Sequence, residues 1–158
     1  MTVSLTDQII HKLERAAELY HRLIVVVAPA GAGKTTALQA VKERTGAPMV
    51  NVNLKLSRRL LDLTERQRAL QISRLLTEIV TENSGEVVLL DNIEILFDVS
   101  LKQDPLRLLQ SLSRNRSVVA AWNGSITNGY MTYAMPEHPE YRKYSLRDFL
   151  VVSPIAST

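Results

Sequence analysis

Residues 23–36 read Leu-Ile-Val-Val-Val-Ala-Pro-Ala-Gly-Ala-Gly-Lys-Thr-Thr, an apolar β-branched run followed by a loop of small residues and the start of a helix. The phosphate-loop signature G-x-x-x-x-G-K-[ST] is matched at Gly33, Lys34 and Thr35, with Ala28 at the first position, where glycine is commoner. A buried strand before the loop and a helix after it are the context that this signature requires. The stretch therefore predicts an α/β fold with a phosphate-binding loop.

Small residues in this loop let successive backbone N–H groups close around phosphate oxygens at the positive end of the following helix. Lys34 would reach the β- and γ-phosphates, and the Thr35 hydroxyl would ligate a magnesium ion that bridges the same oxygens. We therefore expect ATP and Mg²⁺ as cofactors, in preference to a turn whose glycines serve geometry alone. The expected nucleotide-binding residues are Ala30, Gly31, Ala32, Gly33, Lys34, Thr35 and Thr36.

The length of 158 residues suits a single domain, and we expect residues 1–158 to form one P-loop ATPase domain. Hydrophobic residues make up 46% of the chain and charged residues 22%, which is typical of a globular protein. The longest apolar run, residues 23–30, is too short to span a membrane, and no secretory signal is visible. Without cysteine, disulfides and thiolate metal sites are excluded. These features favour a cytoplasmic protein without a membrane anchor.

Strands are expected to alternate with helices along the chain, which indicates a parallel sheet with helices on both faces. After the strand at residue 23, we predict strands over residues 49–54, 86–91, 117–122 and 149–152, hence a five-stranded, mostly parallel sheet. Helices are expected before residue 22, from the phosphate loop to residue 44, over residues 64–83 with a capping box, and from Asp104-Pro105. A strand lies between the phosphate-loop helix and the strand ending at Asp91, an order closer to P-loop ATPases than to small-molecule kinases.

Both ends of the chain leave an interpretation open. The N-terminal helix, within residues 1–22, either packs only on the sheet or also brings Tyr20 and His21 against the nucleotide base. Residues 125–158 form an irregular segment before the last strand, with a hairpin suggested by Asn128-Gly129. We expect the tyrosines of this segment to pack at the edge of the sheet rather than to stack on nucleic-acid bases.

Two polar residues follow strands at the edge where the phosphate loop lies. Asp91 ends a buried strand, and in a phosphate-loop protein an aspartate at this point holds the magnesium ion through its water shell. Asn123 ends the next strand, where its amide would orient water against a γ-phosphate or, equally well, form an Asn-Gly turn. The expected metal residues are therefore Thr35 and Asp91.

With these residues in place, the chain resembles the ATPase core of the AAA+ class: residues 28–35, residues 87–94 and Asn123 match its Walker A, Walker B and sensor-1 positions. The length, residues 53–64 and the Asp-Asn-Ile-Glu motif at residues 91–94 also resemble the small BrxF-like P-loop proteins of type 3 BREX (bacteriophage exclusion) systems. That resemblance implies a cytoplasmic role in bacterial defence against phage DNA. It also implies a larger ATPase, a methyltransferase and a phosphatase-like protein as partners.

Two departures from the AAA+ pattern bear on catalysis. The class usually has a glutamate after the strand-ending aspartate to polarise the attacking water, but Asn92 stands there. Glu94 takes that role if the chain turns back; otherwise it is a carboxylate favoured by a helix N-terminus. The resemblance therefore assigns catalysis to Lys34, Glu94 and Asn123. The second departure is that the chain ends where the class places its helical lid.

Arginines suggest two further roles, each with a simpler alternative. Arg114 and Arg116 are candidates for an arginine finger in a homo-oligomer, or a cation pair at a helix C-terminus. Arg66, Arg68 and Arg74 are candidates for DNA contact, or part of a solvated helix face. The net charge of +3 argues little about nucleic acid.

The sequence favours a slow or partner-stimulated, magnesium-dependent ATPase in a DNA-directed defence complex. The main alternative is a nucleotide-gated interaction module with little or no hydrolysis, which Asn92 supports. A small-molecule phosphotransferase is a third hypothesis, although no arginine-bearing lid of the usual kind is visible.

Overall fold

The computed structural model describes residues 4–154, which are built around a sheet whose five parallel strands lie in the order β2-β3-β4-β1-β7. The parallel strands are β1 (Leu23–Ala28), β2 (Met49–Asn51), β3 (Val87–Asp91), β4 (Ser117–Thr127) and β7 (Leu150–Val152). The strand that ends at Asp91 is separated from β1 by β4. The expected mostly parallel sheet is confirmed.

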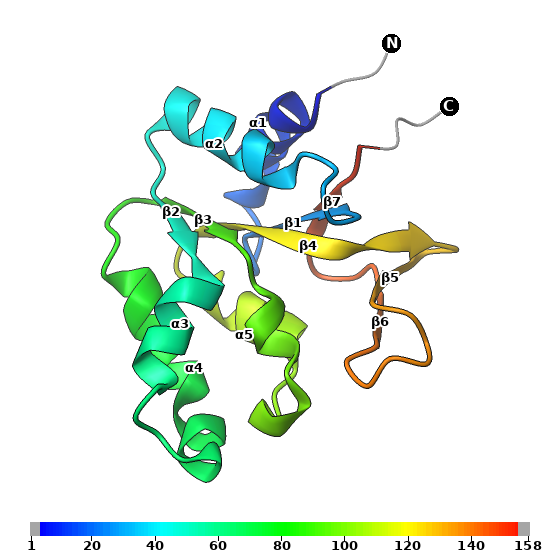
Figure 1. Ribbon diagram of the computed structural model, residues 1–158. Coiled ribbons are helices and arrows are strands. Elements are labelled where there is room, and N and C mark those ends of the chain that lie inside the picture. The colour runs from blue at the N-terminus through cyan, green and yellow to red at the C-terminus, as the bar shows by residue number, and fades with distance from the viewer. Residues whose placement is uncertain (1–3, 155–158) are drawn as a thin grey trace.

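Helices cover both faces of the sheet (Figure 1). On one face lie α1 (Leu5–Ala16) and α2 (Lys34–Thr45); on the other lie α3 (Val52–Leu60), α4 (Glu65–Thr81) and α5 (Pro105–Leu112). Successive residues of β1 point alternately into two hydrophobic clusters, one under each layer of helices. The uninterrupted burial of β1 follows from this double coverage.

The helix starts are set by the side chains that the sequence indicated. The Ser4 hydroxyl accepts a hydrogen bond from Asp7 N at the start of α1, and Asp104 caps α5 ahead of Pro105. Thr64 and Gln67 form a reciprocal capping box at the start of α4. Local sequence therefore determines where these helices begin.

The strand predicted over residues 49–54 is wrong beyond Asn51. The Asn51 side chain accepts a hydrogen bond from Leu54 N (3.0 Å) and caps α3, which starts at Val52. The alternation of apolar residues that suggested a strand is broken at Leu54, whose side chain is exposed. An asparagine that bonds the backbone favours a helix start over strand continuation.

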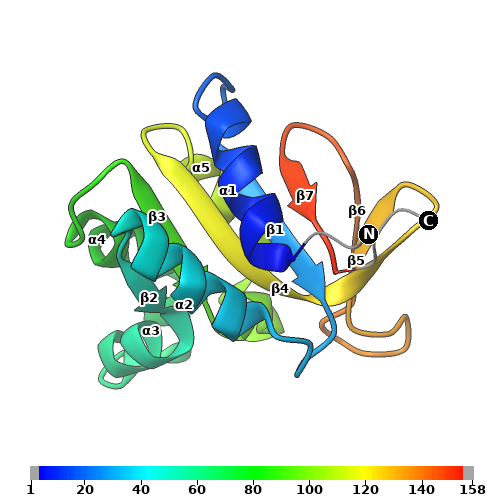
Figure 2. The same cartoon turned by 90° about the horizontal axis from the view of Figure 1, so that it is seen from above.

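The strand predicted over residues 117–122 is too short, because β4 runs on to Thr127 and excludes a turn at Asn123-Gly124. The turn lies instead at Asn128-Gly129, as the hairpin prediction had it, and leads into β5 (Tyr130–Tyr133). Antiparallel β6 (Arg142–Ser145) pairs with β5, which completes seven strands in the described residues. Figure 2 shows this extension projecting beyond the end of β1.

The extension packs on the sheet through aromatic rings. Tyr133 stacks on Phe97 with 3.5 Å between ring centroids, and Trp122 makes edge contacts with Phe97, Tyr133 and Tyr144. The Tyr144 hydroxyl donates to Asp104 (2.8 Å). The packing role expected for the tyrosines is confirmed for Tyr133 and Tyr144.

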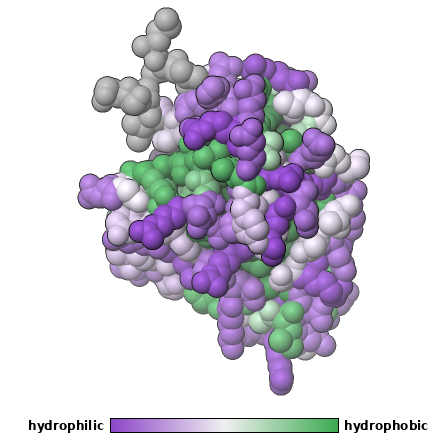
Figure 3. Space-filling view, turned by 180° about the vertical axis from the view of Figure 1, so that it is seen from behind, coloured by the Kyte–Doolittle hydropathy of each residue, from purple (hydrophilic) through white to green (hydrophobic). Residues whose placement is uncertain are grey.

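Two short 3-10 helices, η1 (Glu94–Phe97) and η2 (Val99–Leu101), connect β3 to α5. Within residues 4–154 no helical lid is present, and no helix is long and apolar enough to cross a bilayer. Seen from behind, the surface is mainly hydrophilic, with one larger apolar area in its upper half (Figure 3). The expected α/β core without a lid is thus what the described residues form.

Candidate nucleotide-binding site

A cavity of about 450 Å³ opens at the carboxyl ends of β1, β3 and β4. Ligands bind at this edge in open α/β sheets. Most of the nucleotide-binding, metal and catalytic residues predicted from the sequence lie here. The cavity is lined by Ala30, Gly31, Gly33, Lys34, Thr35, Thr36, Asp91, Asn92, Glu94, Ala121 and Asn123. Ala32 belongs to the same loop, where its N–H donates to the Pro29 carbonyl (3.2 Å).

The loop between β1 and α2 has the conformation of a phosphate cradle. Gly31 and Gly33 have φ angles of 80° and 92°, which other residues adopt only with strain. Lys34 is buried, and its Nζ donates to the carbonyls of Ala28 and Pro29, each at 2.8 Å. Burial lowers the pKa of Lys34, whereas the carboxylates of Glu94 and Asp91 oppose that shift. An ammonium group is therefore held at the loop, close to two acids.

Thr35 and Asp91 meet across the floor of the cavity. The Thr35 hydroxyl donates to Asp91 Oδ2 at 2.7 Å, although the two residues belong to different strand-loop units. Asp91 is buried at the end of β3, opposite Asn51 of β2. A hydroxyl and a carboxylate at hydrogen-bond distance are a donor set that suits Mg²⁺, which prefers oxygen ligands and keeps several waters. The two predicted metal residues are thus adjacent.

Glu94 reaches the cavity because the chain reverses after Asp91. Asn92 has a φ of 52°, in the left-handed region where asparagine is tolerated better than most residues, and η1 follows. The Glu94 side chain is half-buried and lines the cavity. Burial raises the pKa of Glu94, and the nearby Asp91 carboxylate adds to the shift. Glu94 therefore lies in the cavity, although Asn92 occupies the usual position of the catalytic glutamate.

Asn53, on the first turn of α3, supports this reversal and was missed by the sequence analysis. Its backbone N–H donates to the Asn92 carbonyl (2.8 Å), and its Oδ1 accepts from Ile95 N (2.8 Å). Its Nδ2 lies 3.5 Å from Glu94 Oε1. The signal was present in Asn51-Val-Asn53, but assigning this stretch to a strand concealed the helix start that directs Asn53 toward η1.

Asn123 lies in β4 directly opposite Ala28 of β1, so its place at the mouth of the phosphate loop is set by strand register. Its side chain is half-buried and contributes to the cavity lining. Because β4 continues beyond it, the amide is not used in a turn. Asn123 is therefore positioned to hydrogen-bond a group within the cavity.

A model of the ATPase family associated with various cellular activities (AAA) matches residues 24–119, which is more than half of the chain. The chain belongs to the AAA family. The matched range includes the phosphate loop, Asp91 and Glu94, while Asn123 follows shortly after it. The matched residues therefore form a P-loop domain of the AAA ATPase family.

Two solved structures of AAA proteins are similar to it. One comes from work on katanin self-assembly, with 20% sequence identity, 77% of this chain covered and a TM-score of 0.39. The other is PCH-2 from C. elegans, with 21% identity, 78% of this chain covered and a TM-score of 0.41. The chain spans only 40% and 37% of the length of these two proteins. No curated protein sequence matches.

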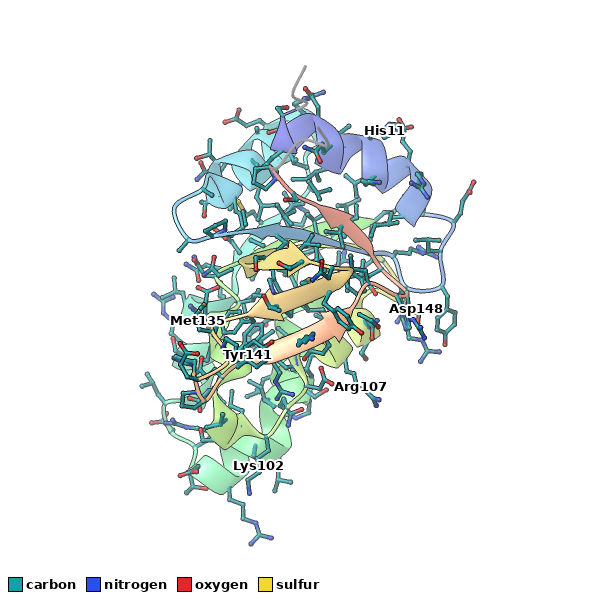
Figure 4. The ribbon with its side chains drawn as sticks, turned by 90° about the vertical axis from the view of Figure 1, so that its right-hand side faces the viewer. His11, Lys102, Arg107, Met135, Tyr141 and Asp148 are labelled. Atoms are coloured by element: carbon teal, nitrogen blue, oxygen red, sulfur yellow. The ribbon has the colours of Figure 1, made fainter. Side chains whose placement is uncertain are left out.

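Tyr20 and His21 do not line this cavity. Both residues precede β1, whereas the cavity lies at its carboxyl end, roughly 20 Å away for a strand of this length. Tyr20 and His21 line a different cavity with Asp148 and Phe149. In Figure 4, Asp148 lies at the right, at the amino end of β7, whereas Met135 and Tyr141 lie toward the left, nearer the other end of the strands.

The candidate finger residues Arg114 and Arg116 also lie at the amino end of the sheet, between α5 and β4. The Arg114 guanidinium lies 5.0 Å from the centre of the Tyr20 ring. Arg116 donates to the carbonyls of Val80, in the last turn of α4, and Gly85, which follows that helix. Neither side chain therefore serves the cavity of its own chain, and a role in a neighbouring AAA subunit stays a prediction.

The basic residues around α4 are largely occupied. Arg68 Nε donates to the carbonyls of Leu60 and Leu63, at 3.0 and 3.1 Å, and so ties α3 to α4. Arg74 pairs with Glu78 one turn further along the helix. Arg66, by contrast, makes no ion pair with any described residue. Arg68 and Arg74 therefore have partners within the fold, whereas the charge of Arg66 is not paired within the described residues.

Proposed function

We propose that this AAA protein is a magnesium-dependent ATPase whose turnover is slow or depends on a partner. The observation that carries the proposal is the convergence of Lys34, Thr35, Asp91, Glu94 and Asn123 on one cavity. Each has a side chain suited to one part of phosphoryl transfer. Asn53, which contacts Glu94, would hold that carboxylate in place.

In this proposal different residues bind the phosphates, the metal ion and the attacking water. The loop N–H groups and Lys34 hold the β- and γ-phosphates, and Lys34 exchanges its bonds to the loop carbonyls for phosphate oxygens. Thr35 and Asp91 would hold Mg²⁺, which supplies charge neutralisation on those oxygens. Glu94 accepts a proton from the attacking water, and Asn123 orients that water.

A second candidate function is a nucleotide-gated interaction module that binds ATP with little or no hydrolysis. It is favoured by Asn92, which occupies the usual position of the catalytic glutamate. In that case ATP would act by bridging the phosphate loop and the segment that begins at Asp91.

The wider role that we propose is in a bacterial BREX defence complex that acts on DNA, with a larger ATPase, a methyltransferase and a phosphatase-like protein as partners. The support is the resemblance of residues 53–64 and 91–94 to BrxF-like proteins. This proposal includes a cytoplasmic location. Direct DNA contact through Arg66, Arg68 and Arg74 is the weakest part, because Arg68 and Arg74 have partners within the fold.

Steady-state ATP turnover of the wild type and Glu94→Gln over a wide range of protein concentration tests the proposal, with nucleotide binding measured in parallel. The proposal predicts turnover in the wild type, its loss in Glu94→Gln and retained binding in both. Tight binding without turnover in either protein would favour the interaction module.

If turnover rises with protein concentration, Arg114→Ala tests the arginine finger. Because Arg114 is exposed and its guanidinium lies over the exposed Tyr20 ring, its replacement should leave the fold intact. A finger would make the variant bind ATP normally and turn it over more slowly. Unchanged turnover would dismiss that role.

A further inference from the structure

A second cavity, of about 510 Å³, lies between the first turns of α4 and the segment η2. We call it the α4–η2 groove, and it is lined by Glu65, Arg66, Ala69, Leu70, Ser100 and Lys102. Gln103 fixes its shape, because its Nε2 donates to the carbonyls of Ala69 (3.1 Å) and Leu101 (3.0 Å). Figure 4 places Lys102 at the lower end of the molecule, remote from His11 on α1.

Apolar side chains at this groove are left to solvent. Leu70 is 72% exposed, and Val99, next to Ser100 in η2, is 58% exposed. Leu70 does not belong to the buried face of α4, which begins at Ile72. A single exposed leucine is ordinary, but an exposed leucine that lines a formed groove, with an exposed valine next to the lining residue Ser100, is typical of an interaction surface.

The charges at the groove are mostly positive and uncompensated. Arg66 and Lys102 are exposed, and neither forms an ion pair within residues 4–154. Glu65 is the acid of the lining, and its place in the first turn of α4 is favoured by the helix dipole. Two free cations beside apolar side chains complement a ligand that carries both carboxylates and an apolar group.

We propose that the α4–η2 groove binds an acidic amphipathic segment of a partner protein. A large apolar side chain of that segment packs on Leu70 and Ala69, and flanking carboxylates pair with Arg66 and Lys102. A nucleic-acid backbone fits less well, because Leu70 and Val99 offer it no polar contact and Arg68 and Arg74 are already engaged. In this proposal Arg66 contacts a partner protein rather than DNA.

Selection of a phage-displayed library of random short peptides on the full-length protein tests the proposal. We expect the recovered peptides to be enriched in Asp or Glu together with Leu, Phe or Trp. Synthetic copies should bind the wild type and lose about tenfold or more in affinity, as at interface hot spots, toward both Leu70→Ser and the double variant Arg66→Ser, Lys102→Ser.

Leu61→Ser is the matched control, since Leu61 is 70% exposed at the end of α3 but is not among the residues that line the groove. It should bind the peptides like the wild type. All of these residues are exposed, so melting temperatures should show that every variant is folded.

Peptides without acidic enrichment, no enriched peptides, or equal binding to all variants would overturn the proposal. So would a labelled DNA oligonucleotide that binds the wild type and Leu70→Ser alike but not the double variant. That result would assign Arg66 and Lys102 to nucleic acid.

Discussion

The Lys34 ammonium and the carboxylates of Asp91 and Glu94 are the charged groups that decide what this cavity can do. Lys34 is held by two loop carbonyls, Asp91 by the Thr35 hydroxyl and Glu94 by Asn53. Phosphate oxygens can replace the carbonyls around Lys34. Asp91 can coordinate a metal ion, and Glu94 can accept a proton. The three groups therefore have separable roles, which single substitutions can distinguish.

Glu94 gives a pH prediction. Its pKa is raised above the ordinary value of 4.5, chiefly by burial, and a base must be ionised to act. The kcat/KM of ATP hydrolysis should therefore fall on the acid side at a pH above that ordinary value. Steady-state rates over a range of pH measure this, and an acid limb at or below the value of an exposed glutamate would contradict it.

The same pKa shift has a consequence for stability. Because the folded state raises the pKa of Glu94, folding favours its protonated form, so the ionised group destabilises the protein at neutral pH. This penalty falls as the pH drops through the raised pKa and is gone below the ordinary value of 4.5. Glu94→Gln should be more stable than the wild type at neutral pH, by a margin that shrinks in acid. Urea unfolding at several pH values checks this, with the exposed Glu86→Gln as the control.

Asn53 is predicted to position Glu94 rather than to bind nucleotide. Asn53→Ala removes the bonds to Ile95 N and Glu94, so turnover should fall while ATP affinity stays near that of the wild type. The lost hydrogen bonds should cost about 1–3 kcal/mol of unfolding free energy. Asn51→Ala is the control, because it removes the cap of α3 without touching Glu94. Equal turnover of the two variants would refute the positioning role.

The pairing of β4 with β5 depends on Gly124, which has no side chain. A Cβ on Gly124 would lie 1.8 Å from the Thr132 carbonyl oxygen, which accepts the Trp122 Nε1 hydrogen bond at 3.0 Å. The close approach of the two strands therefore requires glycine at this position.

Gly124→Ala should destabilise the protein by about 1–3 kcal/mol, because the added methyl group must push β5 away. The fluorescence of Trp122, the only tryptophan, reports the change during urea unfolding. The neighbouring Ser125→Ala loses one exposed hydroxyl contact with Thr132 and should cost less than about 1 kcal/mol. Equal stability of Gly124→Ala and the wild type would show that the strands separate without cost.

The elements that sequence predicted correctly are those with a local cause. Thr64 and Asp104 mark helix starts by capping, and the run before Gly31 marks a strand buried on both faces. The errors arose where tertiary structure decides. Asn51 can end a strand or start a helix. β4 extends past Asn123 because β5 pairs with it, and β6 in turn pairs with β5. The place of Glu94 also depends on tertiary structure. The chain turns at Asn92, and this turn is supported by Asn53 from a distant part of the sequence.

For the chain as a whole, the strand order explains why one cavity collects residues from distant segments. Placing β4 between β1 and β3 brings Asn123 next to the phosphate loop, and α3 brings Asn53 to the far side of Asp91. No helical lid is present in residues 4–154, so the described part of the chain supplies the floor and walls of the cavity.

Calorimetric titration of ATP into the wild type and Lys34→Ala, with and without Mg²⁺, tests the account most directly. We predict that the wild type binds ATP more tightly with Mg²⁺. Lys34→Ala should bind at least about tenfold more weakly, since charged hydrogen bonds contribute about 1.5–3 kcal/mol. Unfolding curves without nucleotide would show that the variant is folded. Binding that is absent from the wild type, or equal in the two proteins, would contradict a nucleotide site at this loop.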